Sequence, residues 1–236
     1  FLDKTLESEP GDAWTLRIKA DAHIALKEYS PALACIDQVL GMDPKNHLMA
    51  EKKGKILLSL GFCQEAATFL GQAAEGGRVS ADLCLLYGDA IRNLENSRYG
   101  TRQTGVPSAE QGMYRWRVNH QYADLWSVPS LNPATINRLT KALEWYDQAT
   151  GRGADEAAVQ NRKSIVYATL KDFPQARTMA EKAISGNKGE PAFLTNLAVI
   201  HVLSGDTDKG AALFLQGMSR FSTNAYFLDQ CAGLYF

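Results

Sequence analysis

The sequence predicts an all-α protein in which pairs of short helices stack into an elongated solenoid. Three observations predict this class. Small residues recur every 34 positions, residues suited to helix caps precede the helical segments, and 45% of the 236 residues are hydrophobic while 22% are charged, as in folded globular chains. A unit of this length has room for two helices, and stacking such units buries a continuous apolar core.

The period is clearest where alanine, glycine or serine stands at a fixed place in each unit. Two series of small residues have an internal spacing of 34, namely Ala20, Gly54 and Gly88, and then Ser164, Ala198 and Ala232. The step from Gly88 to Ser164 is 76 positions, which equals one period and 42 more, so we expect one continuous array with a single insertion 42 positions long. Small side chains let helices approach closely, and leucine at Gly54 or Gly88 is expected to cost about 1–3 kcal/mol or more.

Large and aromatic residues between the small positions resemble those of the tetratricopeptide repeat family. In the first unit Leu16 and Ile36 occupy large positions of the family, and Ala20 and Ala32 occupy small positions. Tyr29 stands at an aromatic position and Pro44 at the proline position. Lys19 and Lys163 depart from the pattern, because a leucine is usual at their position. The resemblance implies a right-handed α-α superhelical solenoid of helix pairs, in which the first helix of each pair lines a concave groove that binds protein partners.

Counting from the matched positions assigns residues 1–236 to a single array. Its predicted parts are the end of a preceding repeat at 1–12, repeats at 13–46, 47–80, 81–156, 157–190 and 191–224, and the first helix of a sixth repeat or a cap at 225–236. The insertion occupies about 97–138 within the third repeat. The last segment is too apolar for a polar outer cap, so we expect the native array to continue at both ends.

Cap residues place the ends of several helices. Asp12, Asn46 and Asp155 are suited to N-caps, and Pro191 suits the first turn of its helix. Six glycines stand near expected helix ends, where a left-handed cap or turn is favoured, namely Gly41, Gly61, Gly76, Gly151, Gly186 and Gly205.

The insertion does not have the composition of a linker. The stretch 97–132 holds five tyrosine and tryptophan residues and four arginines but no lysine. The capping-box pair Ser108 and Gln111 precedes apolar residues at helical spacing, which predicts a helix from about Ala109 to Leu125. Asn132 and Pro133 then have the residue types of an N-cap and a first turn, and they predict a long second helix that continues through Ala149.

Two interpretations of the insertion stay open. In one, its apolar stripe packs back on the scaffold and only shapes the solenoid. In the other, it folds over or beside the groove and presents aromatic and basic side chains to a partner, namely Arg115, Trp116, Arg117, Tyr122 and Trp126. Tryptophan, tyrosine and arginine are enriched at the energetic centres of protein interfaces.

The inner faces of the first helices supply a second candidate surface. Helical spacing together with the family resemblance predicts that partners contact Arg17, Lys52, Lys55, Arg92, Asn161, Arg162 and Asn196. Asn161 and Asn196 are suited to hydrogen bonding with the backbone of an extended peptide. Some family members hold a peptide's terminal carboxylate with a lysine and an asparagine where this chain has Arg17 and Asp21, and Asp21 would repel that carboxylate. The alternative is that these faces are solvated and bind nothing.

Composition and motifs argue against several other functions. A formal net charge of −1 argues against general attraction to nucleic acid or anionic membranes, and no apolar run reaches the roughly 20 residues that a membrane-spanning helix needs. The dispersed cysteines, Cys35, Cys63, Cys84 and Cys231, are expected to be core residues, with a disulfide or metal site as the alternative. Unpaired thiols favour the cytoplasm, with the periplasm as the alternative compartment.

No catalytic or cofactor-binding motif is present, so we predict no enzymatic activity, cofactor or metal. His23 and His201 occupy equivalent positions and are expected to be partly buried structural residues. The predicted function is a protein–protein interaction scaffold that binds a peptide or partner domain, with self-association as a further possibility, in a larger assembly such as a bacterial secretion or export system. The alternative is a substrate-docking or regulatory domain of a larger enzyme, for example a transferase.

Overall fold

The computed structural model describes residues 12–76, 79–94, 131–224 and 227. Its described residues form α-helices joined by short turns, without a strand, so the predicted all-α solenoid is confirmed. Three expectations fall outside the described residues: the end of a preceding repeat at 1–12 (apart from Asp12), the helix from Ala109 to Leu125, and most of the segment 225–236.

The helices follow one another as pairs, and the members of each pair pack together. In chain order they are α2 (Ala13–Ala25) with α3 (Tyr29–Met42), α4 (His47–Ser59) with α5 (Cys63–Gly76), α6 (Ala81–Arg92) with α8 (Pro133–Gly151), α9 (Glu156–Thr169) with α10 (Phe173–Gly186), and α11 (Pro191–Leu203) with α12 (Thr207–Arg220). The third pair, α6 and α8, flanks the long insertion. The helices on the two sides of the insertion thus belong to one stack.

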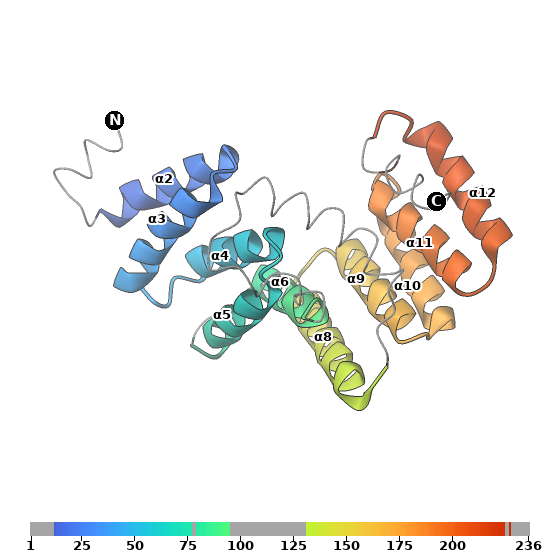
Figure 1. Cartoon of the computed structure of the whole chain (residues 1–236), viewed down its shortest axis with the longest axis horizontal. Helices are drawn as coiled ribbons and strands as arrows, with labels where there is room; N and C mark the ends of the chain where they lie inside the picture. Colours follow the sequence, from blue (N-terminus) through green and yellow to red (C-terminus); the bar gives the residue numbers. More distant parts are fainter. Residues whose placement is uncertain (1–11, 77–78, 95–130, 225–226, 228–236) are drawn as a thin grey trace.

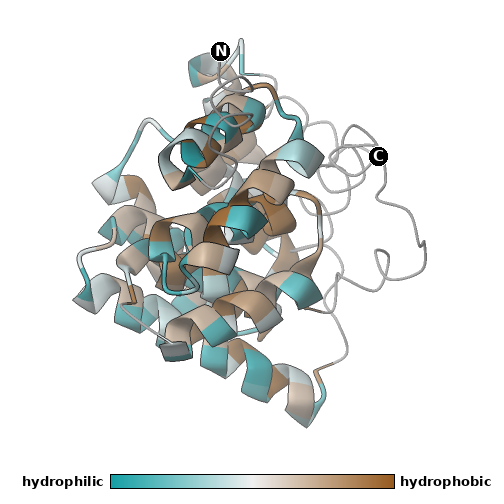
Figure 2. Cartoon of the chain, turned by 90° about the vertical axis from the view of Figure 1, so that its left-hand side faces the viewer, coloured by the Kyte–Doolittle hydropathy of each residue, from teal (hydrophilic) through white to brown (hydrophobic). Residues whose placement is uncertain are grey.

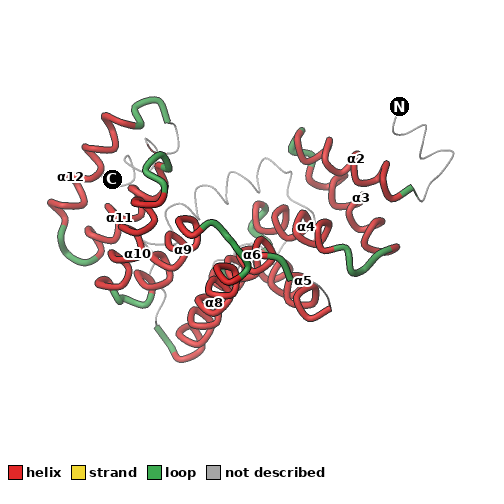
Figure 3. The backbone as a smooth tube through the Cα atoms, turned by 180° about the vertical axis from the view of Figure 1, so that it is seen from behind, coloured by secondary structure: helices red, strands yellow, loops and turns green. Residues whose placement is uncertain are grey.

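The helix pairs follow an arc, with α2 and α3 at one end and α11 and α12 at the other (Figure 1). The first helices of the pairs lie on the hollow side of this arc, and the second helices lie on its outer side. Direct contacts of α4 with α6, α6 with α9, and α9 with α11 join these first helices into an inner layer, and the ion pair of Lys52 with Asp21 links α2 to α4. Figure 3 shows the same arrangement from behind. Hydrophilic and hydrophobic residues alternate along most helices, as two-layer packing requires (Figure 2).

Small residues lie where the helices cross most closely. Ala20, Ser164 and Ala198 have no exposed surface. A Cβ atom at Gly54 would lie 2.6 Å from Leu70 Cδ2, and one at Gly88 would lie 2.5 Å from Tyr146 Cε1. The second helix of each pair therefore packs directly on the backbone of the first, as the recurring small residues predict.

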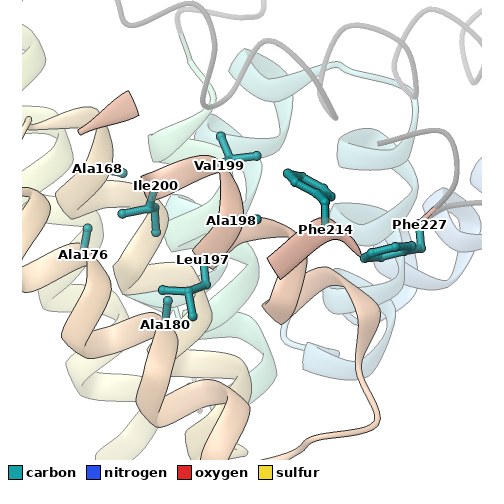
Figure 4. Close-up of a cluster of buried hydrophobic side chains, with 9 residues drawn as sticks. All are labelled: Ala168, Ala176, Ala180, Leu197, Ala198, Val199, Ile200, Phe214 and Phe227. Carbon is teal, nitrogen blue, oxygen red and sulfur yellow. The ribbon is translucent and has the colours of Figure 1, made fainter. Parts of the chain in front are cut away.

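The C-terminal core shows how alanines and large side chains interlock (Figure 4). Buried alanines of α9 and α10 face Leu197 and Ile200 of α11. On the other side of α11, the rings of Phe214 and Phe227 lie 6.1 Å apart at an angle of 44°. Phe227 is fully buried although it follows the last described helix, so it belongs to the core of the array.

The predicted N-caps are confirmed. The side chain of Asp12 accepts hydrogen bonds from Trp14 N at 3.2 Å and Thr15 N at 3.1 Å, and Asn46 accepts one from Met49 N at 3.2 Å. Asp155 accepts from Ala157 N at 3.2 Å. At the end of the insertion Asn132 accepts from Thr135 N at 2.8 Å, and Pro133 occupies the first turn of α8, as predicted.

The structure corrects the prediction that the six glycines near helix ends adopt a left-handed cap or turn. Gly61 and Gly205 have φ of 79° and 88°, but Gly41, Gly76, Gly151 and Gly186 lie inside the last turns of helices without a left-handed backbone. The position of Gly61 and Gly205 is occupied in other repeats by Lys27 (φ 62°) and Lys171 (φ 63°). The sequence did not reveal this, because a lysine carries no signal for a left-handed turn.

Replacing Lys171 with glycine is expected to raise the free energy of unfolding by about 0.5 kcal/mol. Glycine removes a steric cost of about 1–2 kcal/mol and adds a chain-entropy cost of about 0.5–1 kcal/mol. Urea unfolding measures the change. The matched control is Lys182→Gly, at an exposed position inside α10; it should destabilise by about 1 kcal/mol. A loss of stability in both variants would contradict the prediction.

Candidate functional site

The seven predicted groove residues all lie on first helices. Arg17 belongs to α2, Lys52 and Lys55 to α4, Arg92 to α6, Asn161 and Arg162 to α9, and Asn196 to α11. The structure therefore brings residues separated by up to 179 positions onto one inner layer. The predicted partner-binding residues of the insertion, Arg115, Trp116, Arg117, Tyr122 and Trp126, lie outside the described residues, and their role stays a prediction.

The two lysines of α4 connect neighbouring first helices. Lys52 Nζ pairs with Asp21 Oδ1 of α2, and Lys55 Nζ lies 3.2 Å from Asp82 Oδ2 of α6. The carboxylates of both pairs are exposed to solvent. Exposed ion pairs of this kind stabilise a fold by about 0–1 kcal/mol, so these lysines can exchange their partner for an incoming acidic group at little cost.

A partly buried polar cluster joins α6, α8 and α9 at the middle of the array. We call Asp89, Arg92, Tyr146 and Arg162 the Asp89 cluster. Tyr146 Oη donates to Asp89 Oδ1 at 2.8 Å, and Arg162 Nε donates to Asp89 Oδ2 at 3.0 Å. Arg92 Nη2 lies 3.9 Å from Asp89 Oδ1. One carboxylate thus organises side chains from three helices that belong to two repeats.

Protonation in the Asp89 cluster follows from burial and charge. Tyr146 is completely buried, and burial followed by the negative charge of Asp89 raises the pKa of its phenol far above the ordinary value. The same carboxylate raises the pKa of the Arg162 guanidinium. The cluster is therefore a junction between three helices, in which Tyr146 stays a hydrogen-bond donor and Arg162 stays a cation.

Asn161 and Asn196 meet across α9 and α11. Asn196 Nδ2 donates to Asn161 Oδ1 at 2.8 Å. Within the part of the chain that the structure describes, the remaining amide atoms, Asn161 Nδ2 and Asn196 Oδ1, form no hydrogen bond. This leaves one donor and one acceptor side by side, which is the complement of a peptide group.

Two cross-helix pairs recur two repeats apart. Asp21 with Lys52, and Asp89 with Arg162, occupy the same two positions of successive repeats. Sequence reasoning named the two bases as partner contacts and missed that aspartates of the preceding repeat bind them. The sequence contained a signal for this pairing. Lys52 follows Asp21 by 31 positions, and Arg162 follows Asp89 by the same 31 positions once the 42 inserted positions are subtracted.

An exposed apolar surface lies at the N-terminal end of the inner layer. Trp14 of α2 has 65% of its surface exposed, and Leu48, at the same position of the next repeat on α4, has 39% exposed. Arg17 lies one helical turn beyond Trp14 and makes no ion pair with any other described residue. Trp14 and Leu48 are not among the seven contacts that the sequence predicted.

The remaining candidate chemistry is structural. Cys35, Cys63 and Cys84 are buried and form no disulfide with one another, while Cys231 lies outside the described residues. Across residues 12–76, 79–94 and 131–224, no group of histidine, cysteine and acidic side chains is placed to hold a metal ion. No helix described here combines the length and apolarity that crossing a bilayer requires.

The predicted structural histidines are partly buried, as expected. His23 Nδ1 lies 2.6 Å from Glu28 Oε2, and His201 Nδ1 lies 3.5 Å from Asp206 Oδ2. Each pair spans the turn between the two helices of one repeat. Both histidines therefore brace a turn.

Comparison with solved structures finds several of the same architecture. TTC0263, a thermophilic TPR protein of Thermus thermophilus, has a TM-score of 0.67 at 14% identity over 95% of this chain and 100% of its own. YrrB, described as a TPR protein with an unusual peptide-binding site, has a TM-score of 0.58 at 14% identity over 97% of this chain and 96% of its own. PilF of Pseudomonas aeruginosa has a TM-score of 0.57 at 15% identity over 98% of this chain and 86% of its own.

Sequence comparison adds no relative, since no family model and no curated protein matches the chain. The fold therefore rests on three agreeing observations: the repeat period of the sequence, the stacked helix pairs, and the likeness to these solved structures. The chain has the tetratricopeptide repeat fold.

Proposed function

We propose that this chain is a protein–protein interaction scaffold that binds an extended peptide or a partner domain along its inner layer. The observation that carries the proposal is the exposure of Trp14 and Leu48 at one position of two successive first helices. An isolated apolar residue on a surface is ordinary, but tryptophan is among the residues that contribute most to interfaces. Arg17, one turn away, supplies a cation that pairs with no described residue beside this apolar surface.

The polar inner face supports the same proposal. The donor and acceptor left by the Asn161–Asn196 pair suit the backbone of an extended peptide, and Lys52 and Lys55 suit its acidic side chains. Arg92 and Arg162 are held by Asp89, so their proposed part is chiefly to maintain the curvature on which these contacts depend. We keep the insertion residues Arg115, Trp116, Arg117, Tyr122 and Trp126 as a second proposed contact surface.

The context proposed for this scaffold is a larger multi-component assembly such as a bacterial secretion or export system. YrrB, with the same fold, is described as having a peptide-binding site, and this supports a peptide as the ligand class. Size exclusion of the chain alone and with a candidate component tests the assembly, and it separates binding of a partner from self-association.

Replacing Trp14 with alanine is expected to weaken peptide binding by about 2 kcal/mol, roughly 30-fold, because a tryptophan anchor loses its contact area. Peptides selected from a random displayed library serve as ligands, and isothermal titration measures their affinity. The control is Leu215→Ala, which removes another large apolar residue, 59% exposed, from the outer helix α12. Equal affinities for the two variants would contradict the proposal.

A further inference from the structure

We propose that a pocket between α5, α6 and α8 binds an acidic segment of a partner protein. The pocket has a volume of about 410 Å³, and it lies between the second helices of two successive repeats with α6 as its floor. Figure 1 places α5 and α8 on the outer side of the arc. The site is therefore separate from the inner layer, and it goes beyond the function proposed above.

The pocket exists because α8 begins early. Counting 76 positions on from Cys63, where α5 begins, gives Leu139 as the equivalent start of α8, but α8 begins at Pro133. This early start extends the helix by roughly 9 Å. Asn137 and Arg138 of this extension form part of the pocket wall, so the other described repeats have no equivalent wall.

The described charges around the pocket are of one sign. Arg138 and Lys141 lie in its wall, and none of the described residues that line it is acidic. Lys141 is exposed and forms no ion pair with a residue that the structure describes. The side chains of Gln64 and Asn137 add hydrogen-bond donors. This combination suits carboxylate groups, which accept hydrogen bonds and carry the opposite charge.

The floor of the pocket is apolar and held in place. Tyr87 and Ile91 of α6 form it together with Ala67 of α5. The ring of Tyr87 meets Trp145 edge-on at a centroid distance of 4.8 Å, and its hydroxyl lies against Gly71, where a Cβ would come within 2.9 Å. A preformed wall of this kind loses little conformational entropy on binding.

These features together indicate which class of ligand fits the pocket. An apolar floor below a basic rim fits a peptide in which acidic and aliphatic residues alternate, whereas nucleic acid would require a broader basic surface than a chain of net charge −1 provides. The insertion of this chain is less complementary, because residues 97–132 contain four arginines and only two acidic residues, Glu110 and Asp124. We therefore assign the pocket to an acidic partner segment.

Fluorescence anisotropy with a labelled peptide tests the proposal. The probe has three glutamates alternating with leucines between Gly-Ser ends, and the matched probe replaces each glutamate with glutamine. The intact chain is expected to bind the glutamate probe at least about tenfold more tightly, with affinity falling as salt rises from about 0.05 to 0.3 M. Lys141→Glu should reduce this affinity about tenfold. Lys182→Glu, an exposed lysine of α10, should leave it unchanged.

Two outcomes would overturn the proposal. The first is equal binding of both probes, or equal effects of Lys141→Glu and Lys182→Glu. The second is probe binding that appears only when residues 97–130 are replaced by a short Gly-Ser linker, since the insertion itself would then be the occupant. Lys141→Glu reports on the pocket and Trp14→Ala on the inner layer, so failure of this proposal is distinguishable from failure of the inner-layer proposal.

Discussion

Replacing Asp89 with alanine is expected to lower the free energy of unfolding by about 3 kcal/mol, because it removes the acceptor shared by the Asp89 cluster. The hydroxyl of Tyr146 is fully buried and would lose its hydrogen-bond acceptor. Arg162 would remain as a partly buried cation without its carboxylate. Unsatisfied buried groups of these two kinds are among the few causes of large destabilisation by a single substitution.

Urea unfolding of Asp89→Ala, Tyr146→Phe and Asp147→Ala measures this expectation. Asp147 also pairs with a base of α9, Lys163, but it is 66% exposed, so its removal should cost less than about 1 kcal/mol. Tyr146→Phe removes one hydrogen bond and should cost about 1–2 kcal/mol. If Asp89→Ala were no more destabilising than Asp147→Ala, the cluster would not be a structural junction.

Leucine at Gly88 is the second substitution for which we expect a large effect, a destabilisation of about 3 kcal/mol or more. Even a Cβ atom at Gly88 would lie 2.5 Å from Tyr146 Cε1. The ring cannot turn away freely, because its hydroxyl is bonded to Asp89, the residue that follows Gly88. Either the two helices separate or the cluster loses a hydrogen bond.

Two other glycines provide matched controls. At Gly54 the neighbour is Leu70, whose side chain can change rotamer, so Gly54→Leu should cost less than Gly88→Leu. At Gly41, in the last turn of α3, nothing lies within 4 Å, and Gly41→Ala should be neutral or stabilise by up to about 1 kcal/mol. Equal costs at Gly54 and Gly88 would show that the anchoring of Tyr146 is unimportant.

Much of the fold was predictable because periodic packing leaves periodic residues. The small residues at Ala20, Gly54 and Gly88 indicated the helix crossings, and the same spacing after the insertion indicated that one stack continues. Asn132 and Pro133 marked the start of α8 by local hydrogen-bonding chemistry alone. Lys27 and Lys171 show the limit of such reading, because their left-handed turns are imposed by the helices on either side.

The candidate surface was predictable only in part. Helical spacing correctly placed Lys52, Arg162 and Asn196 on inner helices, but spacing within a helix does not say which residue of the next helix stands opposite. The offset between successive first helices decides that Lys52 meets Asp21 and that Arg162 meets Asp89. The pocket beside Tyr87 likewise depends on how far the early start of α8 extends along α5.

The sequence by itself determined the helix pairs, their order and the single interruption of the array, because these depend on local caps and on a repeated requirement for small residues. The tertiary structure decided which charged side chains form ion pairs and which side chains stay exposed to solvent. The physical reason is that ion pairing and exposure depend on distances between helices. Packing sets those distances, and so it leaves Trp14 exposed and makes Asp89 the centre of a partly buried junction.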